Sequence, residues 1–261
     1  MKLSIIIPTK NEEALLPRLL KSIQIQTFRD FEIIVADAKS TDKTREVAKS
    51  FGAKLVEGGM PGPGRNLGAK VACGEFLLFM DADAVMPNDR FLSDTMQEIE
   101  TYAIDVGTCR LKPLSEKSVD SFMHGFYNKY ITLTAGVRPH APGSCIFARR
   151  SVHEAIGGFD ERVVFAEDME YVQRAYKRGY HFAVLKSQPV LVSVRRLAQD
   201  GRLNIAAKYV FGELYMMTKG PFHSTPFDYE FAHFGNKEKQ VAKSSEHQTQ
   251  NSNQDHASKQ R

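Results

Sequence analysis

Short apolar runs alternate with helix-like periodic segments along the first hundred residues. The apolar runs predict strands at 3–7, 32–36, 54–56 and 76–80. Between them, helices are predicted at 12–25, 41–51 and 65–73. In the first of these, Leu15, Leu19 and Ile23 share one helical face. This alternation predicts an α/β protein with a Rossmann-like, doubly wound and mainly parallel sheet.

The second half of the chain has a less regular pattern. It predicts strands at 106–111, 144–148, 180–185 and 190–194, and helices at 119–133, 167–178 and 203–218. From residue 237 onward the sequence is rich in Ser, Gln, Asn and Lys and almost devoid of apolar residues. Such a composition predicts a disordered tail, because it provides too little apolar surface for a core.

Size, charge and cysteine content limit the class of protein. With 261 residues the chain can bury a core without disulfides or zinc. Its net charge of +4 suits anionic ligands, but it is too small and too dispersed to predict nucleic-acid binding. Cys73, Cys109 and Cys145 are widely spaced and odd in number, which is typical of a reduced, cytoplasmic protein. No stretch approaches the roughly 18–20 apolar residues that span a bilayer, so we expect no direct insertion into membranes.

Two aspartates, Asp81 and Asp83, directly follow the apolar run 76–80. Their spacing lets both carboxylates approach one hard cation that keeps open positions for phosphate oxygens. The end of a strand in an open α/β sheet is also where such folds bind ligands. A solvated turn in which Asp83 caps a helix is the alternative.

Three more polar segments are expected near the same edge of the sheet. They are the turn 8–12 after the first strand, Asp37 at the end of the second, and the segment 62–68 that carries Arg65. A carboxylate, an arginine and a metal-binding pair together suit a nucleotide diphosphate. The glycine-rich stretch 58–64 lacks the Gly-Lys-Ser/Thr ending of a P-loop, so it is either a flexible turn or a mobile flap that admits a nucleotide ligand.

Four segments in this order, SIIIPTKNEE, VADAKSTDKT, GRNLGAKVACGEFLLFMDADA and GGFDERVVFAEDMEYVQRAYKRGY, are much more specific than any one motif. Together they resemble the inverting nucleotide-sugar glycosyltransferases of family 2, over roughly residues 3–185. The resemblance implies a GT-A fold over residues 1–220, with a nucleotide-binding part at about 1–112 and an acceptor part at about 113–220. An extension at 221–236 and the tail at 237–261 would follow.

The resemblance also implies roles for individual residues. Base and ribose would be bound by Pro8, Thr9, Asn11, Glu12 and Asp37, and Arg65 would reach toward the nucleotide. Asp83 would bind Mn²⁺ or Mg²⁺ directly, and Asp81 would contact the ribose or a metal-bound water. Asp168 would be the general base, unless Glu167 and Asp168 only favour the start of a helix through its dipole.

Other positions match the family more loosely. Gly143 and Ser144 lie where relatives open the acceptor site beside the donor sugar, or they simply begin a strand. Arg195 and Arg196 would contact the diphosphate or serve as surface charge. The chain has no tryptophan and therefore no Gln-x-x-Arg-Trp motif, which argues against a processive polysaccharide synthase. Ala38, Lys39 and Val85 also depart from the common family pattern.

These observations predict a metal-dependent, inverting glycosyltransferase that uses an NDP-sugar, UDP-linked in our preferred interpretation. The acceptor would be a hydroxyl group or a polyprenyl phosphate, on a glycan, a small molecule or a lipid carrier. A nucleotide-binding subunit without transfer activity and a sugar nucleotidyltransferase are the alternatives. The segment 203–218 would either pack on the domain or lie on the inner face of a membrane as a peripheral contact.

Overall fold

The computed structural model describes residues 1–224. All described residues belong to one compact unit. The predicted tail at 237–261 and most of the extension at 221–236 lie outside the described residues. No helix in the part that the structure describes is long and apolar enough to cross a membrane.

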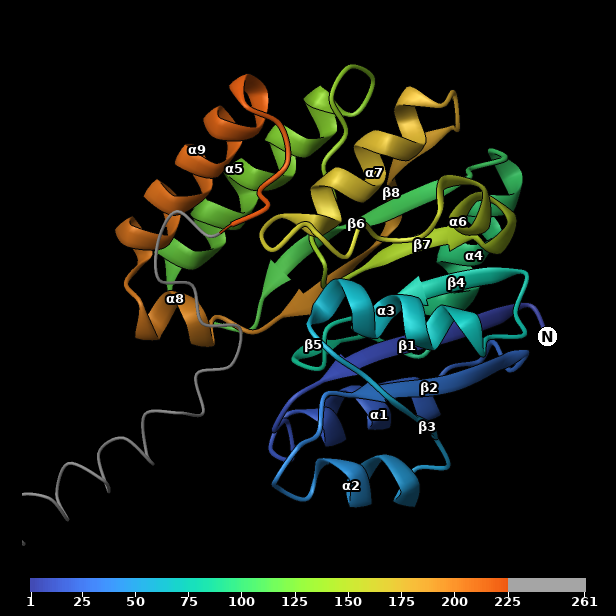
Figure 1. Ribbon diagram of the computed structural model, residues 1–261. Coiled ribbons are helices and arrows are strands. Elements are labelled where there is room, and N and C mark those ends of the chain that lie inside the picture. The colour runs from blue at the N-terminus through green and yellow to red at the C-terminus, as the bar shows by residue number, and fades with distance from the viewer. Residues whose placement is uncertain (225–261) are drawn as a thin grey trace, which may run out of the picture. The chain divides into compact units, whose positions relative to one another are not determined.

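The elements follow one another in the alternating order that the sequence predicts for the first hundred residues (Figure 1). The strands are β1 (Leu3–Thr9), β2 (Phe31–Asp37), β3 (Lys54–Glu57), β4 (Phe76–Phe79), β5 (Ala84–Val85), β6 (Val106–Pro113), β7 (Ile146–Arg149) and β8 (Phe182–Val192). The helices are α1 (Leu16–Gln24), α2 (Thr44–Ser50), α3 (Pro61–Lys70), α4 (Phe91–Thr101), α5 (Ser118–Thr134), α6 (Arg150–Ile156), α7 (Glu167–Lys177), α8 (Arg195–Gln199) and α9 (Arg202–Thr218).

One sheet runs through this unit in the strand order β3-β2-β1-β4-β7-β6-β8-β5. The first four strands of that order are parallel. Beyond them β7 is antiparallel to both β4 and β6, while β6 and β8 are parallel. The predicted fold class, a mainly parallel α/β sheet with a less regular second half, is therefore confirmed.

Burial on both faces explains why the central strands read as continuous apolar runs. In β1, Ile5 and Ile7 belong to one core layer and Ile6 to the other. Successive side chains of a strand point to opposite faces, so a strand that is covered on both sides must be apolar throughout. Helices α1, α2 and α4 supply the first layer, and α3, α6 and α7 supply the second.

The structure departs from the predicted elements at several places. Helix α3 begins at Pro61, so the second part of the stretch expected to be a turn or flap is helical; proline suits the first turn of a helix because its φ is already fixed. The two strands predicted at 180–185 and 190–194 form the single strand β8, which follows β6 across a bulge between Cys109 and Leu111. The predictions do not include β5, α6 and α8, which are short, with 2, 7 and 5 residues. They also omit α4, although its buried residues Phe91, Leu92, Met96 and Ile99 follow a helical period that the sequence does carry.

The close packing of α3 on β1 depends on Gly68. A Cβ atom at this position would lie 2.4 Å from Cγ2 of Ile6, a fully buried side chain. Because Ile6 is held in the sheet, the helix would have to move away from the strand to accept any side chain at residue 68.

We therefore expect Gly68→Ala to lower the free energy of unfolding by about 1–3 kcal/mol, as measured by urea denaturation. Gly125→Ala is the matched control, because it also lies inside a helix but its Cβ would meet nothing within 4 Å. That control should gain about 0.5–1 kcal/mol from helix propensity. Equal stabilities of Gly68→Ala and the unaltered protein would contradict the packing described here.

Candidate active site

Three polar segments meet at the carboxyl edge of the parallel strands, as predicted. Thr9 at the end of β1 is paired with Asp37 at the end of β2, and Ile6 of β1 is paired with Phe79 at the end of β4. The loop with Asp81 and Asp83 leaves β4 at the same edge. This juxtaposition follows from the parallel topology alone, because parallel strands end on the same side of the sheet.

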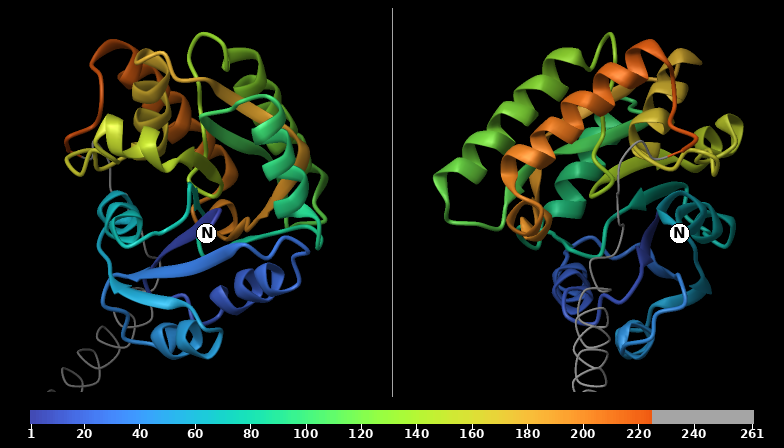
Figure 2. Two further views of the ribbon diagram at one scale, coloured as in Figure 1. Left: turned by 90° about the vertical axis from the view of Figure 1, so that its right-hand side faces the viewer. Right: turned by 60° about the vertical axis from the view of Figure 1, so that its left-hand side comes forward.

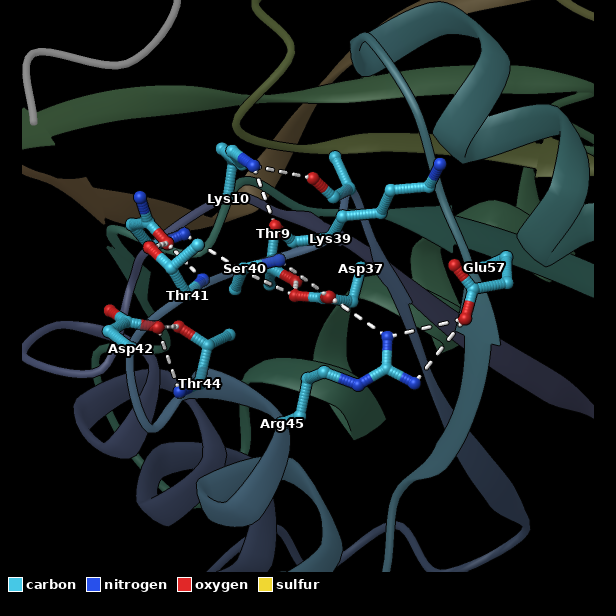
Figure 3. Close-up of polar contacts among 12 residues, drawn as sticks. Thr9, Lys10, Asp37, Lys39, Ser40, Thr41, Asp42, Thr44, Arg45 and Glu57 are labelled. Carbon is cyan, nitrogen blue, oxygen red and sulfur yellow. Dashed lines mark hydrogen bonds and ion pairs between the residues drawn. The ribbon is translucent and has the colours of Figure 1, made fainter. Parts of the chain in front are cut away.

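Asp37 is a fully buried carboxylate with a complete set of donors (Figure 3). Its Oδ1 accepts hydrogen bonds from the hydroxyls of Ser40 (2.6 Å) and Thr9 (3.2 Å). Its Oδ2 accepts from the Ser40 N–H (3.0 Å) and Arg45 Nη1 (3.1 Å). Burial raises the pKa of Asp37, but these donors, Ser40 first, outweigh burial and hold the pKa below its ordinary value. Asp37 is therefore a fixed anion.

Hydrogen bonds join the turn after β1 to the turn after β2 (Figure 3). Asn11 has a left-handed φ of 53°; its N–H donates to Ser40 Oγ and its Oδ1 accepts from the Thr41 N–H, both at 2.8 Å. Lys10 Nζ donates to the carbonyls of Ala38 and Lys39. The two turns thus form one preorganised unit, and the predicted residues Pro8, Thr9, Asn11 and Glu12 lie in or beside it.

Asp81 and Asp83 differ in their surroundings. Asp81 is partly exposed, and its Oδ1 accepts a hydrogen bond from Arg65 Nη2 at 2.9 Å. Burial, then repulsion from Asp81 and Glu12, raises the pKa of Asp83 to about 6. A divalent cation beside Asp83 would offset this repulsion. No group of three or more His, Cys, Asp or Glu residues suited to a metal occurs within residues 1–224, so such a cation would need further oxygen ligands from a bound molecule.

Arg65 lies at the centre of the candidate site. Its side chain is only 2% exposed; Nη1 donates to Glu167 Oε1 at 2.7 Å, and Nη2 donates to Asp81. The guanidinium carbon also lies 5.3 Å from the ring centroid of Phe159. Burial lowers the pKa of Arg65, but the Asp81 and Glu167 carboxylates raise it further than burial lowers it, so the group stays cationic. Arg65 therefore links the loop after β4 to the start of α7.

Asp168 lies in the first turn of α7, next to Glu167. Its Oδ2 accepts a hydrogen bond from the Gly143 N–H at 2.7 Å, and its Oδ1 accepts from the Met169 N–H at 2.8 Å. Burial, followed by the charge of Glu167, raises the pKa of Asp168 to about 7. A carboxylate with such a pKa is suited to accept and release a proton near neutral pH.

Gly143 gives these charged groups the space to come together. A Cβ atom at residue 143 would lie 2.4 Å from Arg65 Nη2 and 3.3 Å from Asp81 Oδ2. Ser144 follows it as a buried residue just before β7. The predicted site residues Gly143, Ser144, Glu167 and Asp168 thus lie together around Arg65.

Arg195 and Arg196 lie close to the candidate site. The sequence leaves two roles open for them, contact with a diphosphate or simple surface charge. Arg195 Nη2 forms an ion pair with Glu12 Oε1 at 3.0 Å, across 183 residues of sequence. Both arginines lower the pKa of Asp83, which places their charges within electrostatic reach of it. Their contact with a diphosphate stays a prediction.

Two tyrosines beside Asp168 carry no sequence motif. Burial, and next the Asp168 carboxylate, raise the pKa of Tyr127 on α5. Tyr209 on α9 is 57% exposed overall; desolvation of its phenol raises its pKa, Arg196 lowers it, and Asp168 raises it again. Both phenols therefore lie near the carboxylate predicted to act as a base. Only packing brings these helices to residue 168, so no local pattern could have identified the pair.

Replacing Arg65 by Met should lower the free energy of unfolding by about 3–5 kcal/mol, since Glu167 would be left buried without its partner. Urea denaturation measures the loss. Arg90→Met is the control, because Arg90 is 69% exposed in its pair with Asp94 and should contribute less than about 1 kcal/mol. Arg65→Lys, whose single ammonium cannot reach both carboxylates, should fall between the two. A fully stable Arg65→Met protein would show that this ion pair is dispensable.

Comparisons with known proteins identify relatives of this chain. A poly(ribitol-phosphate) beta-N-acetylglucosaminyltransferase, TarS, from Staphylococcus aureus is 28% identical over 207 residues, which are 75% of this chain and 36% of TarS. A poly(ribitol-phosphate) beta-glucosyltransferase from Bacillus spizizenii is 28% identical over 208 residues, 75% of this chain and 33% of that protein. This chain therefore spans about a third of the length of these relatives.

Solved structures show the same fold. S. aureus TarS 1-349 in complex with UDP-GlcNAc has a TM-score of 0.62 and 26% identity, and covers 75% of this chain and 59% of its own. The mannosyltransferase PcManGT from Pyrobaculum calidifontis, in complex with GDP-Man and Mn²⁺, has a TM-score of 0.66 at 20% identity and covers 85% of this chain and 66% of its own. A family profile described as Glycosyl transferase family 2 matches residues 4–157, more than half of the chain. The chain therefore belongs to glycosyl transferase family 2.

Proposed function

We propose that this protein is a metal-dependent, inverting glycosyltransferase that moves a sugar from an NDP-sugar to an acceptor hydroxyl. The observation that carries the proposal is the arrangement around Arg65. It links Asp81, which follows a parallel strand, to Glu167, the neighbour of Asp168. A donor-binding edge and a candidate base are thereby held beside one another. Membership of a family of transferases supports the same chemistry.

The donor is proposed to be UDP-linked. S. aureus TarS has been solved with UDP-GlcNAc, and glucosyl-3-phosphoglycerate synthase from Mycobacterium tuberculosis with UDP-Glc and Mn²⁺. In this chain Asp37 and Thr9 would bind the base and ribose. Asp37 already accepts four hydrogen bonds, about the number that a carboxylate has lone pairs to accept. A base N–H would have to replace one donor, and Arg45, a partly exposed one, is the candidate to move.

Asp83 and Asp81 would hold Mn²⁺ or Mg²⁺. The fit rests on the crowding of carboxylates that raises the pKa of Asp83, because a dication relieves that repulsion. When bound, such a cation neutralises charge on a departing diphosphate. Arg195 and Arg196 would add positive charge at the same edge. Within residues 1–224 no third His, Cys, Asp or Glu joins these two in a group suited to a metal, so the donor itself would complete the coordination.

Asp168 would supply the general base. The Gly143 N–H holds one oxygen of this carboxylate, and the other lies against the start of α7. As the acceptor hydroxyl attacks the anomeric carbon, Asp168 would take its proton. The carbon–oxygen bond to the diphosphate breaks in the same displacement, so the anomeric configuration inverts. A phosphate acceptor has no proton to lose at neutral pH, so the raised pKa of Asp168 favours a hydroxyl.

Titration calorimetry with UDP, GDP, CDP and TDP, each with and without Mn²⁺, tests the donor site. We expect UDP to bind in a metal-dependent manner, and Asp83→Ala to weaken that binding by about tenfold or more. Asp94→Ala, a partly exposed carboxylate on α4, is the control and should bind like the unaltered protein. If none of the four diphosphates binds, the proposed function is wrong. UDP binding without transfer to any acceptor would favour a non-catalytic nucleotide-binding subunit.

The rate should also depend on the protonation of Asp168. Below pH about 7 its carboxyl keeps a proton in the folded protein and cannot accept another, so kcat/KM should rise with pH through about 7 and then level off. Asp168→Asn should retain UDP affinity while its transfer rate falls by about 10²–10⁴-fold. Asp94→Asn should keep both the rate and its pH profile. Full transfer by Asp168→Asn would exclude this residue as the base.

A further inference from the structure

Helices α5 and α9 lie side by side (Figures 1 and 2). Both carry exposed apolar side chains. Most of the large ones are more than half exposed: Phe122 75%, Phe126 70%, Leu133 81%, Leu203 87%, Val210 61%, Leu214 58% and Met217 60%. We call these seven residues the α5/α9 face. A cluster of exposed apolar side chains of this kind is unusual on a protein surface and is typical of a site that contacts another protein or a membrane.

The spacing of these residues is that of an amphipathic helix. In α9, Leu203, Val210, Leu214 and Met217 follow one another at intervals of seven, four and three residues. The residues that pack inward, Ile205, Gly212 and Met216, occupy the opposite side. One of the two predictions for 203–218 is that this segment packs on the domain. The structure shows such packing for the inner side of the helix only, because the outer apolar side chains are exposed. Both helices have 17 residues, so each is about 25 Å long.

The carboxylates of these two helices are neutralised by inward-facing partners. Asp120 is fully buried and accepts hydrogen bonds from Arg202 Nε (2.7 Å) and Nη2 (3.0 Å). This pair ties the start of α5 to the start of α9, and Arg202, followed by Ser115, lowers the pKa of Asp120 to about 2. Glu213 contacts Arg138 at 3.0 Å and His140 at 2.9 Å.

Exposed positive charge remains around the apolar face. Lys129 on α5, Lys117 just before it and Lys219 just after α9 are all exposed. Glu116, also exposed, offsets one of these charges beside Lys117. The face thus combines aromatic and aliphatic side chains with a rim of lysines, which complements a surface that is apolar inside and anionic outside.

Other residues of the same two helices, outside the α5/α9 face, lie toward the candidate active site. Glu213 of α9 contacts His140, three residues before Gly143, whose N–H binds Asp168. Tyr127 of α5 and Tyr209 of α9 lie near Asp168 as well. A surface that held the outer side of the two helices would therefore lie next to the acceptor half of the site.

We propose that the α5/α9 face lies on the surface of an anionic lipid bilayer, with both helices in the plane of the membrane interface. A second copy of the chain fits less well, because pairing two such faces would bring lysines together without exposed carboxylates on either helix to pair with them. Docking in this way does not depend on the proposed transfer reaction.

Sedimentation of the full chain with lipid vesicles tests the proposal. We expect binding to vesicles that contain phosphatidylglycerol and phosphatidylcholine, and much weaker binding to phosphatidylcholine alone or at high salt. Phe126→Ser combined with Leu214→Ser should reduce vesicle binding by about tenfold or more, since each removes exposed apolar surface that would enter the interface. Ile25→Ser with Tyr102→Ser is the matched control, because those side chains are 57% and 65% exposed on other elements, and it should bind like the unaltered protein.

Charge reversal gives a second, independent variant. Lys117→Glu with Lys129→Glu should weaken binding to anionic vesicles about as strongly as the Phe126/Leu214 variant does. Lys21→Glu with Lys49→Glu, which alters exposed lysines of α1 and α2, is the control and should not weaken binding. An unchanged midpoint of urea denaturation reports that each variant is folded, whether or not the protein binds UDP. The proposal is overturned by absence of vesicle binding, or by equal binding of the Phe126/Leu214 variant. A dimer in solution that this same variant converts to a monomer would assign the face to a second copy instead.

Discussion

One buried cation, the guanidinium of Arg65, holds the candidate site together. It pairs with Asp81 from the loop after β4 and with Glu167 at the start of α7, and so joins two segments that are far apart in the sequence. Removing a guanidinium and two carboxylates from water costs several kcal/mol, and the two short hydrogen bonds repay much of that cost only if the geometry is kept. Gly143 fits the same constraint, because a side chain there would collide with Arg65. The position of Asp168 follows from these contacts.

The site carries more negative than positive charge by itself. Five carboxylates gather around it: Glu12, Asp81, Asp83, Glu167 and Asp168. Arg65 is already paired with two of them, and Arg195 with one. Crowding of this kind raises the pKa of Asp83 and of Asp168. An excess of carboxylates at a strand edge is unfavourable for the folded protein alone, and the cation of the proposed function would offset it. The carboxylates at this edge thus lower the stability of the protein without a ligand and favour the binding of a cation.

The two helices that border the acceptor side are organised by the same principle of inward pairing. Asp120 and Glu213 use their charges to fix α5 and α9 to each other and to the loop before Gly143. With the carboxylates turned inward, the outer surface keeps apolar side chains and lysines. The inward ion pairs therefore fix the position of the helices and also leave their outer face without exposed carboxylates.

The sequence by itself determined the parallel half of the sheet and the placement of Asp37, Asp81 and Asp83 at its edge. Those features depend on local period and on the rule that parallel strands end on one side, and both can be read from neighbouring residues. The partners of Arg65, the antiparallel strand β7 and the pair between Arg195 and Glu12 were decided only by the tertiary structure. The Arg65–Glu167 and Glu12–Arg195 pairs join residues 102 and 183 positions apart, and β7 pairs with a strand far from it in the sequence. At such separations side-chain packing selects the partner, and no sequence period reports it.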